Sequence, residues 1–451
     1  MSIITLQLGQ CGNQIGGQLF QTLVDDIYAK PTQTQISPTS NQEYKEQALE
    51  TFFRFSPGIT DAESEQLKAR AVMVDMEQKV ITQTCSDARK SKKWMYADGQ
   101  QYYQKRGSGN NWAHGFCVHG PGCDEKVMEL IQREAEKCDN LGGFLSLMSL
   151  AGGTGSGVGA HITQSLRDEF PHSFIVNQVV WPYNTGEVIV QNYNAVLTLS
   201  HLYQTADAIV LMENDHLHKI CTQLMNVKKV SFRDINKVIC HKLASVLQPL
   251  TNSSSPNRQN HLGEMLEDLV PHPNYKLLTV KNIPQMSDRS LQFSTFQWPG
   301  LLKHLRQMLI ADAAMEEGIN WDVRLGEETP RGSVKHNRSV SNMLVLRGKD
   351  IQTVNVSDFQ EPQLYVPWVP PSIGLSVWRN SRTFNMYEKS AALVTNSKSP
   401  VYHLNYITEK AWNMFSSRAY VHQYTKHGLA EEDFVDSFAA MEQIISNYNK
   451  L

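Results

Sequence analysis

The stretch Ala151-Gly152-Gly153-Thr154-Gly155-Ser156-Gly157 decides how this chain can fold. The apolar run 144–150 before it predicts a buried strand, and residues 158–166 after it are compatible with a helix. Glycines let the backbone turn through positive φ and let a ligand approach closely. The amides at the start of a helix then point at an anion. The pattern predicts a phosphate-binding loop, and the alternative, a glycine-rich turn without a ligand, would need fewer glycines.

Two kinds of phosphate loop can be compared with this stretch. A Walker loop needs a lysine followed by Ser or Thr after the last glycine, and neither is present. The dinucleotide fingerprint matches in one frame, Gly155-x-Gly157-x-x-Ala160, but it requires an acidic residue about twenty positions later. The next apolar run, 176–181, contains no acid. We therefore expect a mononucleotide as the ligand, and a dinucleotide-dependent dehydrogenase is disfavoured.

Three further turns carry residues that suit the same chemistry. Residues 3–8 predict a central strand, and Gly9-Gln10-Cys11-Gly12 leads from it into a helix over 13–28. Asp75 and Glu77 follow the strand predicted over 69–74, where carboxylates can bind a hard cation. The stretch Gly107–Trp112 is a third glycine turn. Each has a plainer alternative, namely a simple βα turn, two solvated loop acids and an Asn-Gly-type turn. Turns at the carboxyl edge of a parallel sheet can nevertheless converge on one nucleotide.

The composition excludes several classes of protein. The chain has 451 residues with a formal net charge of -3, which argues against bulk nucleic-acid binding. No apolar run approaches the roughly 20 residues of a membrane span, and the N-terminus lacks the basic start of a signal peptide. The seven cysteines form no Cys-x-x-Cys pair, which indicates reduced thiols in the cytoplasm and no zinc site.

The stretches Gly9–Gly16 and Gly152–Gly157, which follow their strands in this order along the chain, resemble the tubulin family over nearly the whole chain. Within the family, Trp181–Asn194 and the end of the chain most resemble the delta type. The resemblance implies an α/β fold of the tubulin/FtsZ kind. It comprises a Rossmann-like parallel-sheet GTPase domain over 1–231 and a core helix over 232–250. An intermediate α/β domain with a mixed sheet over 251–388 and a C-terminal helical hairpin within 389–451 complete it.

The resemblance also implies GTP or GDP as the ligand, with Mg²⁺ held by Asp75 and Glu77. The residues implied to contact the nucleotide are Gln10, Cys11, Gln14, Asn110, Ser149, Ala151, Gly152, Gly153, Thr154, Gly155, Ser156, Gly157, Glu187, Asn214, Phe232 and Asn236. Asn110 would face the terminal phosphate, Glu187 the ribose, and Phe232 would stack on guanine while Asn236 reads the base edge. Gln191 replaces a second acid usual near the ribose. Without the resemblance, Phe232 is interpreted as core packing and Asn236 as a helix-surface residue.

One catalytic residue is implied, and it would act in a neighbouring subunit. Aligned on Val270-Pro271, Glu264 takes the place of the alpha-type catalytic glutamate, whereas Gln259 and His261 replace polar and acidic residues usual in that loop. The alternative is a surface glutamate on an amphipathic helix. The family also makes head-to-tail filaments, so hydrolysis of GTP would be completed in trans. The rival hypothesis is a GTP-bound scaffold or cap without turnover.

Helical periodicity predicts one helix over 403–424 and a second from about residue 431. The final residues, 446–451, lack the glutamate-rich tail of alpha and beta types, so weak binding of tail-dependent partners is expected. The delta resemblance implies the cytoplasm and cytoskeleton, at the centriole, basal body and base of the cilium. The implied partners are alpha-, beta- and epsilon-tubulin and centriolar proteins, with no nucleic acid and no membrane span.

Overall fold

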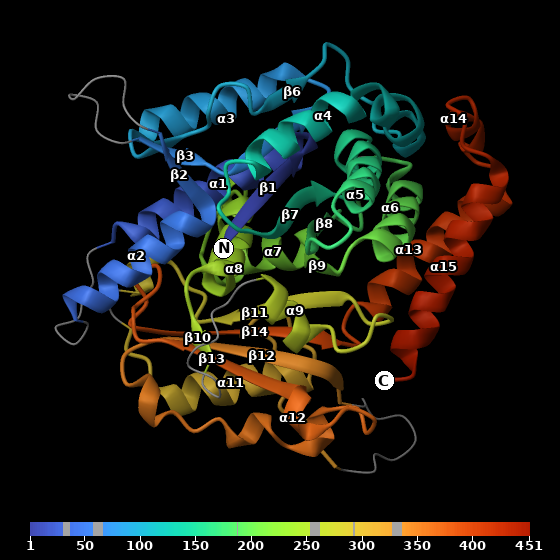
Figure 1. The fold of residues 1–451 in the computed structure, drawn as a ribbon. Coiled ribbons are helices and arrows are strands. Elements are labelled where there is room, and N and C mark those ends of the chain that lie inside the picture. The colour runs from blue at the N-terminus through green and yellow to red at the C-terminus, as the bar shows by residue number, and fades with distance from the viewer. Residues whose placement is uncertain (30–36, 57–65, 187, 253–261, 292–293, 327–335) are drawn as a thin grey trace. The chain divides into compact units, whose positions relative to one another are not determined.

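A computed structural model describes residues 1–451 except 30–36, 57–65, 187, 253–261, 292–293 and 327–335 (Figure 1). The chain divides into two compact units. Unit 1 contains Met1–Val24, Glu46–Asn214 and Tyr402–Ser446, and unit 2 contains Asp25–Lys45, Asp215–Val401 and Asn447–Leu451. The boundaries expected after residues 231, 250 and 388 stay predictions.

Unit 1 is built on a parallel sheet. Its strands lie in the order β9-β8-β7-β1-β4-β6. They are β1 Ser2–Leu8, β4 Ala71–Asp75, β6 Gln101–Tyr103, β7 Leu141–Ser149, β8 Ile175–Trp181 and β9 Ala208–Glu213. The central strands are almost continuously buried, as expected for a parallel sheet covered on both faces. This confirms the predicted Rossmann-like sheet, and it brings the turns after β1, β4 and β7 to one edge.

Helices connect and cover these strands (Figure 1). They are α1 Gly9–Ile27, α2 Pro38–Phe52, α3 Gln78–Ser91, η1 His114–His119, α4 Gly120–Ala135, η2 Thr154–Val158, α5 Gly159–Glu169 and α6 Gln191–Thr205. A small sheet of β2 Phe53–Ser56, β3 Gln66–Ala69 and β5 Trp94–Met95 adds to the unit.

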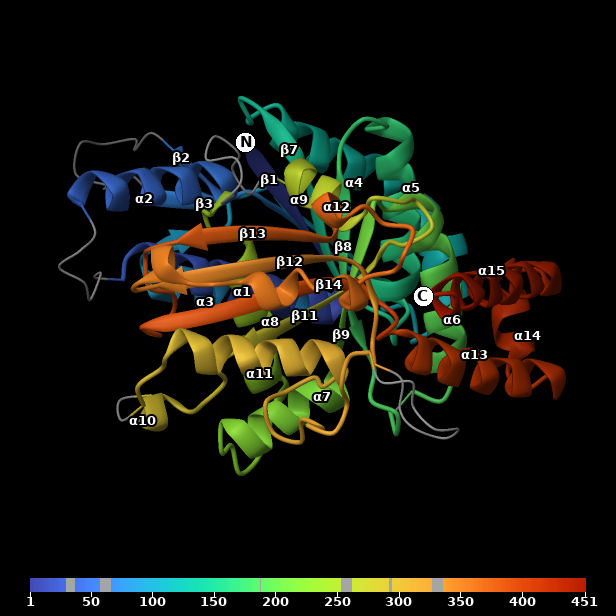
Figure 2. The same cartoon turned by 90° about the horizontal axis from the view of Figure 1, so that it is seen from below.

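The C-terminal part of unit 1 is helical, with one correction to the sequence-based prediction. The single helix expected over 403–424 is wrong, because α13 Val401–Ser416 ends before a turn and α14 Val421–Thr425 follows it. Arg418 and Tyr420 in that turn have φ of 54° and 61°, in the left-handed region that a continuous helix does not allow. The last helix, α15 Glu431–Asn449, begins where predicted and lies beside α13 (Figures 1 and 2). The rings of Trp412 on α13 and Phe438 on α15 are 5.2 Å apart.

Unit 2 contains the predicted mixed sheet, in the order β10-β13-β12-β14-β11. Its elements are α7 Asn214–Lys219, η3 Ile220–Leu224, α8 Phe232–Leu247, β10 Thr251–Asn252, α9 Leu262–Leu269, β11 Leu277–Ile283, α10 Asp288–Leu291, α11 Trp298–Ile310, β12 Ser339–Gly348, η4 Ile351–Thr353, η5 Ser357–Phe359, η6 Pro362–Leu364, α12 Pro371–Gly374, β13 Leu375–Asn380 and β14 Lys389–Ser397. Helix α11 lies beside this sheet (Figure 2). Leu305 and Leu309 of α11 pack into one apolar core with Leu344 and Leu393 of the sheet.

A buried charged cluster explains why residues 25–45 belong to unit 2. Arg382 Nη1 lies 3.1 Å from Asp26 Oδ2, and both side chains are almost completely buried. The hydroxyl of Tyr44 donates to the same carboxylate at 2.6 Å, and Gln248 Nε2 donates to it at 3.1 Å. Because a buried charge is tolerated only when it is paired and hydrogen-bonded, this network fixes the segment on its unit.

Two expectations about the whole chain can be checked. Each of the seven cysteines is a free thiol. Over the part of the chain that the structure describes, none of the helices combines the length and apolar character needed to cross a bilayer.

Candidate nucleotide-binding site

The predicted phosphate loop joins the end of β7 to a helix start. Ser149 Oγ accepts a hydrogen bond from the Ala151 amide at 3.2 Å, which bends the chain as it leaves the strand. Gly153 caps the helical turns that begin at Thr154, and its carbonyl accepts from the Gly157 amide at 2.9 Å. The first N–H groups of a helix have no partner within that helix, and they carry the positive end of its dipole. This geometry suits a phosphate group.

The turn after β1 touches this loop directly. Gly9 has φ of +73°, and a Cβ built on it would lie 2.7 Å from the Gly155 amide nitrogen. The two turns therefore converge, as the sequence predicted. Gln10, Cys11 and Gln14 lie in the first two turns of α1, with Gln10 exposed. Burial raises the pKa of the Cys11 thiol to about 12, so this group stays protonated at neutral pH, which disfavours nucleophilic chemistry at this position.

The third glycine turn lies against the same loop. A Cβ built on Gly153 would lie 2.7 Å from Ser108 Cβ, and Ser108 Oγ is 3.1 Å from Thr154 Oγ1. Asn110 has φ of 54°, a left-handed conformation that asparagine adopts more readily than most residues. Its Oδ1 is 3.9 Å from the position that a Cβ on Gly152 would take. The side-chain amide of Asn110 thus lies at the phosphate loop.

The two candidate magnesium ligands stand at the end of β4. Asp75 is 4% exposed, and its Oδ1 accepts from the Met76 amide at 2.8 Å. Burial raises the pKa of this carboxyl to about 6, although the backbone hydrogen bonds oppose the shift. Glu77 is exposed, and its Oε1 would lie 2.5 Å from a Cβ on Gly107 of the third turn. A desolvated carboxylate beside a second carboxylate gains from a nearby cation, so the pair fits Mg²⁺.

An asparagine that the sequence analysis missed holds two of these loops together. Asn194 of α6 is completely buried, and its Nδ2 donates to the carbonyl oxygens of Asn110 at 2.9 Å and Ala151 at 2.7 Å. The available signal was an asparagine that stands directly beside Tyr193 and close to Val196 and Leu197 in an otherwise apolar stretch. The fully buried amide therefore bonds both the third glycine turn and the phosphate loop.

The ribose side is described only in part. Glu187 lies outside the described residues, so its expected ribose contact stays a prediction. Gln191 is buried and its Nε2 donates to the Tyr183 carbonyl at 2.8 Å. Its amide nitrogen therefore holds the turn before α6.

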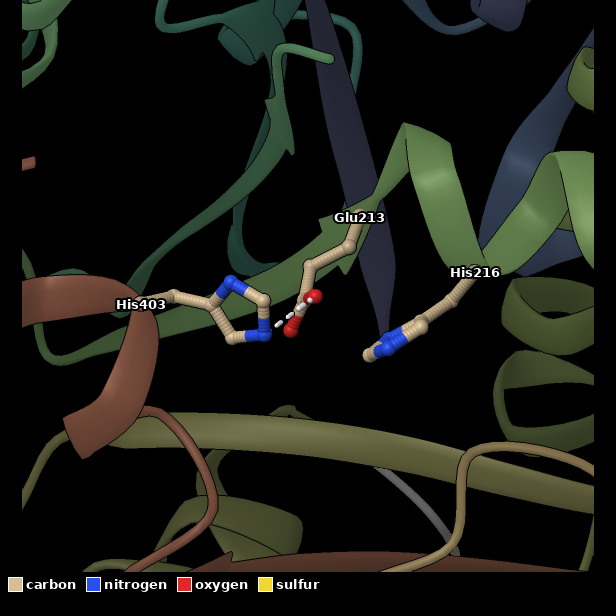
Figure 3. Close-up of side chains that lie close together, drawn as sticks. All are labelled: Glu213, His216 and His403. Atoms are coloured by element: carbon tan, nitrogen blue, oxygen red, sulfur yellow. Dashed lines mark ion pairs between the residues drawn. The ribbon is translucent and has the colours of Figure 1, made fainter. Parts of the chain in front are cut away.

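Asn214 follows β9 directly and is 9% exposed. Its neighbour Glu213 forms an ion pair with His403 of α13, with Oε2 2.8 Å from Nε2 (Figure 3). Figure 3 also draws His216, which lies on α7 and belongs to unit 2. The pair joins the end of β9 to the C-terminal helices within unit 1.

The candidate base contacts are on α8 of unit 2. Phe232 is 61% exposed, so the alternative of core packing does not hold, and an exposed ring is available for stacking. Asn236 lies one turn later on the same helix face and is 7% exposed, so it is not a surface residue. Ser231 and Asp234 form a capping box that fixes where α8 begins, and hence the position of Phe232 on it.

Glu264 lies in the first turn of the amphipathic helix α9. Leu262, Met265, Leu266 and Leu269 are buried, whereas Glu264 is half-buried and Glu267 is exposed. Glu264 is therefore more covered than a typical surface glutamate. Its action on a neighbouring subunit stays a prediction.

Comparison with known proteins agrees with this geometry. The model of the Tubulin/FtsZ family, GTPase domain, matches residues 2–222, a match that implies binding of GTP or GDP. The chain is 52% identical to the "Tubulin delta chain" of Mus musculus and 50% identical to that of Homo sapiens, and each alignment covers 100% of both chains. It is 27% identical to the "Tubulin beta-1 chain" of Glycine max over 99% of this chain and 95% of that one. The chain therefore belongs to the tubulin family of GTP-binding cytoskeletal proteins and, within it, to the delta type.

Proposed function

We propose that this protein acts in the assembly or maintenance of the triplet microtubules of centrioles and basal bodies, and so in the formation of cilia. The observation that carries the proposal is the identity of about half of all residues to delta chains over the full length. The proposed location is the centriole, the basal body and the base of the cilium. The proposed partners are alpha-, beta- and epsilon-tubulin together with centriolar proteins.

The proposed nucleotide chemistry rests on the three turns that meet in unit 1. The amides of Gly152–Gly157, with Gln10 and Asn110, would bind the phosphates of GTP. Asp75 and Glu77 would hold Mg²⁺, which offsets phosphate charge when bound. These groups position the phosphates and neutralise their charge, which is the main requirement of phosphoryl transfer.

The residues proposed to recognise guanine are on α8. Phe232 offers an exposed ring for stacking, and Asn236 offers an amide that can pair with the guanine edge. Asn214 would contact the base or the ribose. Recovery of GTP or GDP from protein purified without added nucleotide would support this assignment, and recovery of ATP or NAD would contradict it.

We further propose that hydrolysis is completed in trans. A head-to-tail contact joins unlike faces of two subunits and produces an open filament. Glu264 would then orient the attacking water in the site of the next subunit. The rival is a GTP-bound scaffold or cap without turnover, which is favoured by Gln259 and His261, two loop residues outside the described part of the chain.

The cellular role can be tested by removing the protein from a ciliated cell that contains it and counting the microtubules of each centriolar blade by electron microscopy. We expect blades with fewer than three microtubules, and restoration of triplets by the wild-type chain. Normal triplets after complete removal would overturn the proposed role.

Turnover can be separated from scaffolding with Glu264→Ala and the matched control Glu267→Ala on the same helix. Single-turnover hydrolysis of GTP is measured in assemblies with a partner tubulin whose nucleotide faces α9. We expect Glu264→Ala to slow hydrolysis by about 10²–10⁴-fold, the usual contribution of a positioned acid or base. The affinity of the Glu264→Ala variant for GTP in its own site should not change. The control Glu267→Ala, at an exposed residue, should leave the hydrolysis rate unchanged. Equal rates in assemblies that form normally would favour the scaffold.

A further inference from the structure

We propose that Tyr424 and Asn194 act as a pair of positioning residues that make the affinity for nucleotide depend on the docking of α14 against α6. This inference rests on the phosphate site proposed above. It adds a residue of the C-terminal helices to the control of that site. Both residues belong to unit 1, as do the two loops that they hold.

The central group is the side-chain amide of Asn194, whose four hydrogen bonds use its whole capacity. Nδ2 donates to the carbonyl oxygens of Asn110 and Ala151, at 2.9 and 2.7 Å. Oδ1 accepts from the Trp112 amide at 3.0 Å and from the Tyr424 hydroxyl at 2.6 Å. An asparagine amide has two donor hydrogens and an oxygen with two lone pairs. The group is therefore fully satisfied in this orientation alone.

The orientation is set by backbone groups of the two loops. If the amide turned over, its oxygen would face the carbonyl oxygens of Asn110 and Ala151, and its NH₂ group would face the Trp112 N–H, which can only donate. The hydroxyl of Tyr424 fills the second lone pair of Oδ1 and so holds the amide in the position that ties the third glycine turn to the phosphate loop. Burial raises the pKa of Tyr424 well above the usual value, so the hydroxyl keeps its proton at neutral pH.

A second link runs parallel to the first. Asn111 Nδ2 donates to the Gln423 carbonyl at 3.0 Å, and Asn111 Oδ1 accepts from the His114 amide at 3.0 Å. Residues 423 and 424 of α14 are therefore both hydrogen-bonded to the neighbourhood of the third turn, 423 directly and 424 through Asn194. This turn carries Asn110, whose side-chain oxygen lies beside Gly152. A shift of α14 would consequently act on the groups that face phosphate.

The test compares Tyr424→Phe with Tyr193→Phe in the full chain. Both tyrosines are fully buried and their rings lie 5.5 Å apart, but the Tyr193 hydroxyl donates to the Ala419 carbonyl at 3.0 Å and has no hydrogen bond to either loop. Each variant loses one buried hydroxyl. We expect similar losses of thermal stability, whereas GTP affinity should fall about three- to tenfold in Tyr424→Phe alone, the range of one buried hydrogen bond.

Affinity and dissociation rate are measured with fluorescent GTP and GDP well below the melting temperature. Asn194→Ala should weaken binding more, and adding Tyr424→Phe to it should cause no further loss, because the hydroxyl acts through Asn194. Equal loss of affinity in both tyrosine variants, or additive effects of Tyr424→Phe and Asn194→Ala, would overturn the proposal. Failure of the wild-type chain to bind GTP would contradict the proposed function itself and the positioning role with it.

A second measurement needs no variant. Coupling between two sites is reciprocal, so bound GTP should stabilise α14 by as much as α14 favours GTP. Hydrogen exchange of the amides of 421–425 should slow by about the same three- to tenfold when the wild-type chain binds GTP, if these amides exchange through opening of α14. Unchanged exchange in α14, with slowed exchange in the phosphate loop, would show that the C-terminal helices are not coupled to the site.

Discussion

The contact between the turn after β1 and the phosphate loop can be tested with one methyl group. Gly9 has φ of +73°, and a Cβ on it would lie 2.7 Å from the amide nitrogen of Gly155. Gly9→Ala therefore introduces both a strained backbone and a close contact with the loop that faces phosphate. Gly99 is the matched control, because it has φ of +82° and no heavy atom within 4 Å of its Cβ position.

The difference between the two substitutions isolates the contact. A non-glycine residue in the left-handed region costs about 1–2 kcal/mol, and both alanine variants carry this cost. A methyl group forced into a packed region costs a further ~1–3 kcal/mol, and only Gly9→Ala carries it. If the loop relieves the contact by moving, this second cost appears as weaker binding of nucleotide. Since 1.4 kcal/mol corresponds to a factor of ten, we expect GTP to bind about 5- to 100-fold more weakly.

The assay combines unfolding in urea with titration of fluorescent GTP on the wild type and both variants. Gly99→Ala should lower the free energy of unfolding while leaving the affinity for GTP unchanged. Gly9→Ala should lower the free energy of unfolding further and weaken the binding of GTP. Wild-type affinity in Gly9→Ala, with a stability equal to that of Gly99→Ala, would refute the convergence of the two turns on one ligand.

Two further predictions concern charged groups. Adding Mg²⁺ should raise the affinity for GTP, and Asp75→Asn should reduce this gain about tenfold. The control Asp98→Asn, at an exposed ion pair, should leave the gain unchanged. If Asp75→Asn showed the same gain as the wild type, Asp75 would not be a Mg²⁺ ligand. Burial, and secondarily the charge of Lys281, lower the pKa of Lys242 from its usual 10.5 to about 7. Between these two pH values the unfolded chain therefore binds more protons than the folded chain, and the free energy of unfolding rises with pH. The rise is at most about 1.4 kcal/mol per pH unit, and Lys242→Met should abolish it in urea unfolding measured at pH 7–10. If the free energy of unfolding changed with pH equally in the wild type and in Lys242→Met, the shift would be contradicted.

Much of the fold was predictable because it depends on local signals. A buried apolar run followed by glycines and a helical pattern identified β7 and its loop, and the same logic found β1 and β4 with their turns. The order of parallel strands then brings those turns to one edge without further information. The second, mixed sheet of unit 2 was expected from the resemblance to the tubulin family.

The break after α13 was not predictable from periodicity. Apolar spacing continues through residues 417–420, and it is the left-handed backbone at Arg418 and Tyr420 that ends the helix. Neither residue type favours that conformation, so the surrounding packing must impose it. The rings of Tyr424 and Phe434, 5.3 Å apart, show one such contact after the turn.

The consequence for the candidate site follows from this break. Because the chain turns at 417–420, α14 presents Tyr424 to Asn194, a contact between residues 230 positions apart. The match to the GTPase domain ends at residue 222, yet the compact unit that carries the phosphate loops includes residues 402–446. A fragment ending at 222 would keep the three glycine turns and lose the hydroxyl that bonds the amide between two of them. On the proposed coupling, the C-terminal helices would complete the nucleotide site, and a partner that displaced α14 would act on GTP through Asn194.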